Sequence, residues 1–155
     1  MTAGDGRALL RAAMDAVRDC AAQMESQAES LLQALPKLPM HEGLRATAME
    51  LIAGLQDTSR RVTFELALLQ AELGEDKADA ATAVRTLSRA DATMMDALAA
   101  VTEVVDQLES AAERDEESER AFVLVIEATG VMLQGLEKAR AATQALGAGM
   151  PAART

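Results

Sequence analysis

Residues 10–35 read LRAAMDAVRDCAAQMESQAESLLQAL, and their apolar side chains recur at alternating intervals of four and three residues. The seam that results consists of Leu10, Met14, Val17, Ala21, Met24, Ala28, Leu31 and Leu35. Such a repeat, held over about four heptads, is typical of a long helix that packs against other helices. Pro36 follows directly and disfavours continuation, because proline lacks the amide hydrogen. The stretch therefore predicts a helix from about Asp5, which can act as its N-cap, to Leu35.

The same spacing returns three more times along the chain. It predicts helices over residues 40–73, 79–112 and 119–146, followed by a tail over residues 147–155. Ala, Leu, Glu, Gln, Met and Arg dominate these segments, and they lose little side-chain entropy in a helix. Four long helices joined by short turns predict an all-α fold: a single domain over residues 1–155 that forms an antiparallel up-down-up-down four-helix bundle.

Turn-forming and polar residues mark the joints between these helices. Gly74 is well placed to stop the second helix, since glycine tolerates the backbone conformations found at helix ends. Residues 113–120 contain no apolar side chain and are expected to form a solvated turn. Ser118, within that turn, is a candidate N-cap for the fourth helix.

Two of the predicted seams contain an irregular position. In the second helix the seam passes through Thr58, Val62 and Leu66, and these successive steps of four predict a local unwinding of the supercoil. In the third helix Asp91 falls among apolar seam residues. We expect Asp91 to be partly exposed or to bond a nearby or facing hydroxyl such as that of Thr58. A small rotation of the helix would then bring Ala90 into the core.

The charge balance and the single cysteine exclude several classes of protein. The chain has 15 Lys and Arg against 25 Asp and Glu, which gives a net charge of −10. Nucleic acid is therefore not expected as a partner, because its binding requires a basic surface. Cys20 alone permits no disulfide framework and no cysteine-based zinc site. Its place beside the first seam predicts a small buried side chain.

The chain shows no sign of a membrane-spanning or secretory segment. No apolar run approaches the roughly 20 residues that a transmembrane helix needs. The first ten residues contain no apolar core of the kind found in signal peptides. We therefore expect a cytoplasmic protein without a transmembrane segment.

The side chains that catalysis most often uses are scarce. His41 is the only histidine and Cys20 the only cysteine, and they lie on different segments. A di-iron bundle needs two Glu-x-x-His units and covalent haem needs Cys-x-x-Cys-His, so neither site can form. The glycines are scattered and form no phosphate-binding loop. The sequence thus predicts no catalytic residue, no metal and no cofactor, and a protein that is not an enzyme.

His41 carries one resemblance that points to a different activity. Residues 40–46 read MHEGLRA, which resembles both the His-x-x-Lys-Gly pattern of histidine phosphotransfer domains and the His-Glu-Leu-Arg box of sensor kinases. The segment departs from the first pattern at Leu44 and Arg45, and from the second by the insertion of Gly43. The resemblance implies, as an alternative, a phosphorelay intermediate with His41 as phosphoacceptor. Otherwise His41 is a surface histidine.

The last predicted helix is apolar on more than one side. Between Phe122 and Leu136 the only charged residue is Glu127. A helix of this kind must be buried on all its apolar sides or present a second face to another molecule. Gly130 and Gly135 favour a second face, since glycine lets another backbone approach closely. The alternatives are a wider core seam and a partner-binding surface formed by Phe122, Val123, Leu124, Ile126, Val131 and Leu133.

We favour the partner-binding surface, which predicts a helical protein–protein interaction module. An adaptor, an assembly factor or a small acidic chaperone would have these properties. Its partner would be another protein or a second copy of the chain, so a homodimer is one outcome. The alanine-rich heptads with few aromatic residues also resemble phasins and apolipoproteins. That resemblance implies, as an alternative, a coat protein on a lipid or granule surface.

Overall fold

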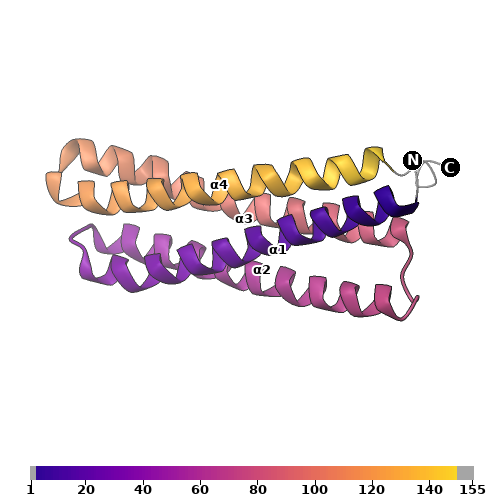
Figure 1. Ribbon diagram of the computed structural model, residues 1–155. Coiled ribbons are helices and arrows are strands. Elements are labelled where there is room, and N and C mark those ends of the chain that lie inside the picture. The colour runs from indigo at the N-terminus through magenta and orange to yellow at the C-terminus, as the bar shows by residue number, and fades with distance from the viewer. Residues whose placement is uncertain (1–2, 150–155) are drawn as a thin grey trace.

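The computed structural model describes residues 3–149, and these residues form four long helices without a strand. The helices are α1 (Ala3–Ala34), α2 (Glu42–Gly74), α3 (Ala80–Arg114) and α4 (Glu119–Ala148). Two short 3-10 turns, η1 (Leu35–Lys37) and η2 (Glu116–Ser118), lie in the first and last connections. Successive helices run in opposite directions along an elongated bundle (Figure 1). The predicted all-α, up-down-up-down four-helix bundle is confirmed.

The order of the helices around the bundle follows their order in the chain. α1 packs mainly against α2 and α4, and α3 packs against the same two helices. α2 and α4 therefore occupy opposite corners of the bundle, and their outward faces point in different directions (Figure 1). None of the helices within residues 3–149 is long and apolar enough to cross a membrane.

The core follows the predicted seam closely in α1 and departs from it in α2. Ser59 is buried in α2, where the predicted seam had Thr58, and Ile52 is buried next to the partly exposed Leu51. With Ser59 in the seam, the steps before and after Val62 alternate between three and four residues. The predicted local unwinding was therefore wrong. Ser59 can be buried because its side chain is small and its hydroxyl donates to the Gln56 carbonyl at 2.8 Å.

Two alanines occupy the core face in the first half of α4. Ala121 and Ala128 are buried, whereas their neighbours Phe122 and Thr129 are only partly buried. An alanine occupies little space, so it lets a helix approach its neighbours closely. Phe122 is consequently only partly buried, at the edge of the core. Val125 and Met132 are buried, and the other large apolar side chains of the first half of α4 lie on its flanks and its outer face.

The turn between α2 and α3 does not use Gly74 as the left-handed residue that ends the helix, as had been expected. α2 ends at Gly74, but the left-handed residue of the turn is Asp76, with φ of 57°. The amide of Lys77 donates to the Glu72 carbonyl at 2.8 Å, as in a Schellman motif. α3 then begins with Asp79, whose carboxylate accepts from the Thr82 amide at 2.8 Å. That bond lowers the pKa of Asp79.

Two of the predicted caps are not formed as expected. α1 begins at Ala3, so Asp5 lies within its first turn and not at the N-cap position. Ser118 stands at the N-cap position of α4, but its side chain makes no capping hydrogen bond. The turn is instead stabilised by Asp115, which accepts from the Glu117 amide at 3.0 Å.

Candidate functional site on the outer face of α4

The structure separates the six predicted partner-binding residues into two groups. Val123, Ile126, Val131 and Leu133 each expose between 36% and 42% of their surface. The remaining two, Phe122 and Leu124, are partly buried against the core. A wider core seam therefore accounts for Phe122 and Leu124 but not for the four exposed side chains.

Three of the exposed residues line up with a glycine along the outside of the helix. Val123, Ile126, Gly130 and Leu133 follow one another at intervals of three, four and three residues. This is heptad spacing, so the four residues share one face of α4. All four are exposed, whereas Val125, Ala128 and Met132 form the buried face. We refer to Val123, Ile126, Gly130 and Leu133 as the outer stripe.

Val131 belongs to a different part of the surface. It lines a hollow of about 320 Å³ between α1 and α4, together with Cys20, Gln23 and Gly135. A Cβ placed on Gly135 would meet the side-chain oxygen of Gln23 at 2.5 Å. Gly135 therefore lies against α1 within the bundle, and it gives no support to an external partner.

Gly130 is in the opposite situation. A Cβ placed on Gly130 would have no heavy atom within 4 Å, apart from the helix's own backbone. Nothing within the described bundle requires a glycine here, and glycine costs about 1 kcal/mol relative to alanine inside a helix. The open backbone at the centre of the outer stripe would let another helix approach α4 closely.

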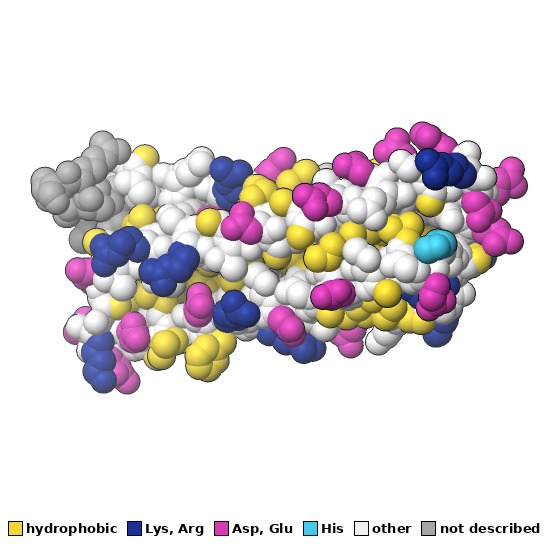
Figure 2. All heavy atoms as spheres, turned by 180° about the vertical axis from the view of Figure 1, so that it is seen from behind, with side chains coloured by type: hydrophobic (Ala, Val, Ile, Leu, Met, Phe, Trp, Pro, Cys, Tyr) yellow, Lys and Arg dark blue, Asp and Glu magenta, His cyan; other side chains and the backbone are white. Residues whose placement is uncertain are grey.

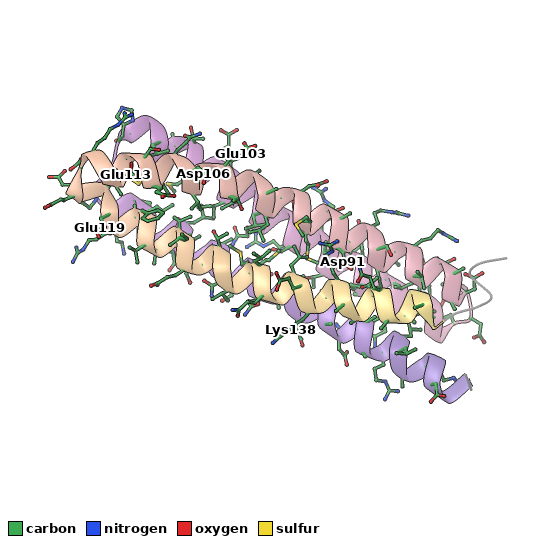
Figure 3. All side chains as sticks on the ribbon, turned by 90° about the horizontal axis from the view of Figure 1, so that it is seen from above. Asp91, Glu103, Asp106, Glu113, Glu119 and Lys138 are labelled. Atoms are coloured by element: carbon green, nitrogen blue, oxygen red, sulfur yellow. The ribbon has the colours of Figure 1, made fainter. Side chains whose placement is uncertain are left out.

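Acidic side chains surround the beginning of the outer stripe. Val123 borders a shallow hollow of about 540 Å³, whose charged lining is Glu116, Glu117, Glu119, Arg120 and Glu127. None of these five side chains makes an ion pair within 4.0 Å among the described residues. Figure 3 shows Glu119 at the end of the bundle where α3 passes into α4, close to Glu113 of α3. The rim of the stripe is therefore acidic.

Sequence reasoning missed a second exposed apolar pair. Phe64 and Leu68 on α2 expose 68% and 50% of their surface, more than Val123, Ile126 or Leu133. They are four residues apart, and both lie outside the predicted seam. Two large apolar residues on the polar side of a predicted helix would have indicated this exposed pair. Because α2 and α4 occupy opposite corners, this pair does not join the outer stripe.

His41 lies at the surface, immediately before α2. It stands at the N-cap position, and its side chain makes no capping hydrogen bond. Its imidazole packs over Gly43, and both residues line a hollow of about 680 Å³ that also includes Arg114 and Glu117. Figure 2 shows the histidine exposed near one end of the bundle. A phosphoacceptor role for His41 stays a prediction.

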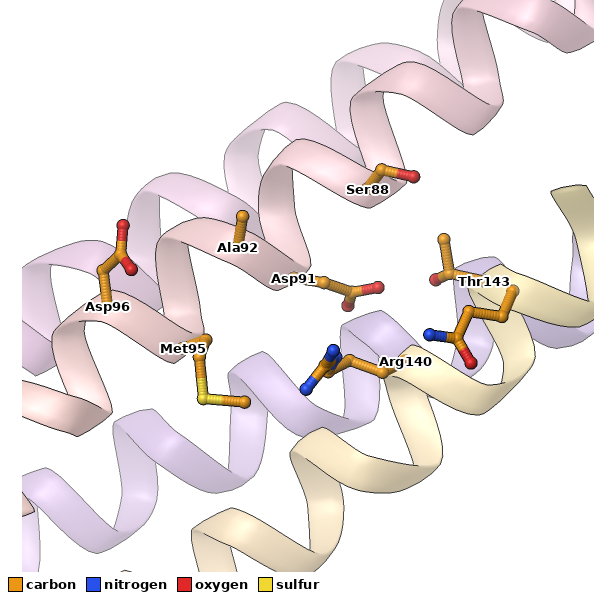
Figure 4. Close-up of a pocket in the computed structure, with 8 residues that line it drawn as sticks. Ser88, Asp91, Ala92, Met95, Asp96, Arg140 and Thr143 are labelled. Atoms are coloured by element: carbon orange, nitrogen blue, oxygen red, sulfur yellow. The ribbon is translucent and has the colours of Figure 1, made fainter.

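Two buried side chains of the core are titratable: Cys20 and, less expectedly, Asp91. Cys20 is 2% exposed, as its sequence position predicted, and burial, followed by the nearby Asp91 charge, raises its pKa to about 12. Asp91 is 6% exposed and bonds a facing hydroxyl, so the second of its two expected outcomes applies and partial exposure does not. The facing hydroxyl is that of Thr143 on α4 and not that of Thr58, and Arg140 of α4 lines the same hollow (Figure 4). Burial raises the pKa of Asp91, while the Thr143 hydroxyl and the Arg140 charge act in the opposite direction.

No protein family, curated protein or solved structure matches the chain. Within residues 3–149, no group of three or more His, Cys, Asp or Glu side chains is arranged to hold a metal ion. The proposal that follows therefore rests on the geometry of the outer stripe and its rim.

Proposed function

We propose that the protein is a non-enzymatic interaction module that binds an amphipathic helix of another protein along the outer stripe. The observation that carries the proposal is the exposure of Val123, Ile126 and Leu133 around the open backbone of Gly130. Apolar side chains at this spacing match the anchors by which amphipathic helices bind to helical surfaces. Burial of the exposed apolar area supplies the driving force, at roughly 25 cal/mol per Å².

The acidic rim specifies the chemistry of the partner. Glu116, Glu117, Glu119 and Glu127 outnumber Arg120 around the start of the stripe. A partner helix with basic residues beside its apolar seam would be attracted to this rim, which favours rapid and selective association. A second copy of this chain would bring a second acidic rim and a net charge of −10, so a different protein is the better fit.

The length of the stripe limits the strength of binding. Val123 and Leu133 are ten residues apart, which corresponds to about 15 Å along a helix. A partner helix would therefore contact α4 over about three turns. Such an interface is smaller than those of stable complexes, so we expect reversible binding in the micromolar range.

Two designed peptides test the proposal directly. Both carry the same leucine seam on an amphipathic helix, and the flanking positions are lysine in one peptide and glutamate in the other. Fluorescence anisotropy is measured while the protein is added to each labelled peptide. We expect the lysine-flanked peptide to bind and the glutamate-flanked peptide not to bind. Added salt should weaken the binding, because it screens exposed charges.

Two matched variants separate binding at the outer stripe from general attraction to an acidic protein. Ile126→Glu places a charge in the stripe, and Phe64→Glu makes the same kind of change in the exposed apolar pair of α2. Both side chains are exposed, so both variants should fold. Only Ile126→Glu should remove binding. Equal binding by wild type and Ile126→Glu would contradict the proposal, and so would an equal loss in both variants.

A further inference from the structure

Another hollow lies between α3 and α4, in the part of the bundle nearer the end of α4. Its volume is about 330 Å³, and it shares no lining residue with the outer stripe. Figure 4 shows its walls, which are formed by Asp91, Met95 and Asp96 from α3 and by Arg140, Thr143 and Gln144 from α4. The size is within the range of small-ligand sites.

One residue that lines the hollow carries a buried acceptor without a donor. Asp91 is 6% exposed and lines the hollow, and its Oδ1 atom has no hydrogen-bond partner. Arg140 is the nearest cation in the lining, yet the two residues form no ion pair within 4.0 Å. Leaving a buried acceptor unsatisfied is costly, and a carboxyl group can present either oxygen because its terminal torsion is soft.

The other polar groups of the hollow add to the excess of acceptors. The Thr143 hydroxyl has a single proton, which the Ala139 carbonyl at 2.9 Å and the Asp91 carboxyl both compete to accept, and its lone pairs remain free for a donor in the hollow. Asp96 is exposed at the mouth and brings a second carboxylate. With both carboxyl groups ionised and Arg140 charged, the lining has a net charge of −1, which one monovalent cation would neutralise.

We propose that this hollow binds a primary ammonium group on an alkyl stem. The three N–H donors of an ammonium match the carboxylates of Asp91 and Asp96 and the lone pairs of Thr143. The Met95 side chain supplies an apolar wall for the alkyl stem. Such a group occurs at the end of a lysine side chain of another protein and in free alkylamines. The site does not depend on the function proposed for the outer stripe.

Binding is linked to the ionisation of Asp91. The charged or titratable groups facing Asp91 are Arg140 on α4, Cys20 on α1 and Asp96 one turn along α3. Cys20 stays neutral, since its pKa is about 12. An ammonium favours the ionised carboxylate, so its affinity should increase as the pH rises through the titration of Asp91. A protein without this carboxyl group should show no such increase.

Methyl NMR of the methionines gives a direct readout. Met95 lines the hollow, whereas its neighbour Met94 is fully buried in the core and reports on the fold. The protein is titrated with n-butylammonium chloride at constant ionic strength. We expect a saturable shift of the Met95 methyl signal in the millimolar range or below. Tetramethylammonium has no N–H donor and should cause no saturable shift.

Two variants complete the test. Asp91→Asn should weaken n-butylammonium binding by at least about tenfold, because a charged hydrogen-bond partner is lost. Asp106→Asn changes an exposed acid of α3 outside the hollow and should leave the affinity unchanged. An unchanged Met94 signal shows that each variant is folded. The proposal is overturned if wild type gives no saturable shift, or if Asp91→Asn binds as tightly as wild type.

The source of the ammonium is decided by a second probe. Nα-acetyl-lysine methylamide presents the same group at the end of a lysine side chain. Tighter binding of this probe than of n-butylammonium assigns the site to a lysine of another protein. Tighter binding of n-butylammonium assigns it to a free amine. If neither probe shifts Met95, the proposal is wrong.

Discussion

The carboxyl group of Asp91 is unfavourable for stability when it is buried and ionised, and the same group is the main acceptor proposed for the hollow between α3 and α4. Its place in the seam of α3 buries a carboxyl group among apolar neighbours, with one oxygen unpaired. Burial raises the pKa of Asp91, so the folded protein binds this proton more tightly than the unfolded chain does. The same unpaired oxygen is what gives the hollow beside Arg140 its preference for a donor.

The pH dependence of stability should reveal this carboxyl group. The contribution of neutral Asp91 is fully present below the unfolded pKa, about 3.9, and is lost as the pH rises through the folded pKa. Asp91→Asn stays neutral at every pH. We therefore expect this variant to exceed wild type in free energy of unfolding by about 1 kcal/mol or more at neutral pH. The difference should shrink toward about pH 4.

Chemical denaturation at the two pH values measures this difference. A variant that is less stable than wild type at neutral pH would contradict the interpretation. So would a difference that does not change with pH.

Cys20 should behave as an inert side chain in the folded protein. It is 2% exposed and its pKa is about 12, so almost no thiolate is present near neutral pH. We expect a thiol reagent to label it only as fast as the bundle opens, and at once when the protein is unfolded in urea. The rate of labelling, followed by absorbance, checks this. Rapid labelling under native conditions would show that Cys20 is accessible.

At the scale of the helix, α4 has two apolar faces, one that packs in the core and one that is exposed. Its inner seam, including Met132 and Leu136, is buried, and its outer stripe is exposed. Val123→Glu in the stripe should therefore change the free energy of unfolding by less than about 0.5 kcal/mol. Met132→Ala in the inner seam should cost about 2 to 5 kcal/mol, because it leaves a cavity.

Circular dichroism and urea unfolding compare these two variants. If Val123→Glu lowered the free energy of unfolding as much as Met132→Ala, or lost helicity, Val123 would belong to the core. The outer stripe would then not be available for a partner.

The helices show which parts of the pattern could be read from the sequence. The seam of α1 was predicted well because its apolar residues recur at heptad spacing throughout. Ser59 in α2 and Ala121 in α4 were missed, since the prediction favoured hydrophobic bulk over small size. Close packing of helices favours small side chains where backbones approach, and this depends on the neighbouring helix. The pairing of Asp91 with Thr143 was missed for the same reason. A heptad pattern shows which residues point into the core, but it does not show which residues of the neighbouring helices lie at the same height along the bundle.

The site was predictable to the extent that it depends on composition. The excess of apolar residues in α4 was visible in the sequence, and four of the six predicted residues are exposed. The sequence could not show that Val123, Ile126 and Leu133 belong to the outer stripe and Val131 to the α1–α4 hollow, because this depends on how the helix is oriented in the bundle. The different roles of Gly130 and Gly135 became clear only from the space around each residue.

For the whole molecule, charge should oppose self-association. The chain has a net charge of −10, and acidic side chains surround the start of the outer stripe. Light scattering on a sizing column should therefore give the mass of a monomer, 16.3 kDa, over a range of protein concentrations. A stable dimer that Val123→Glu dissociates would show instead that the stripe binds a second copy of the chain.

The central claim is that α4 binds a basic amphipathic helix along its outer stripe, and a footprint of the bound peptide tests it most directly. Amide hydrogen exchange is measured with and without the lysine-flanked peptide described above. The account predicts additional protection within residues 119–137 of α4, with no change around Phe64 of α2. Protection around Phe64, or spread evenly over the acidic surface, would contradict it.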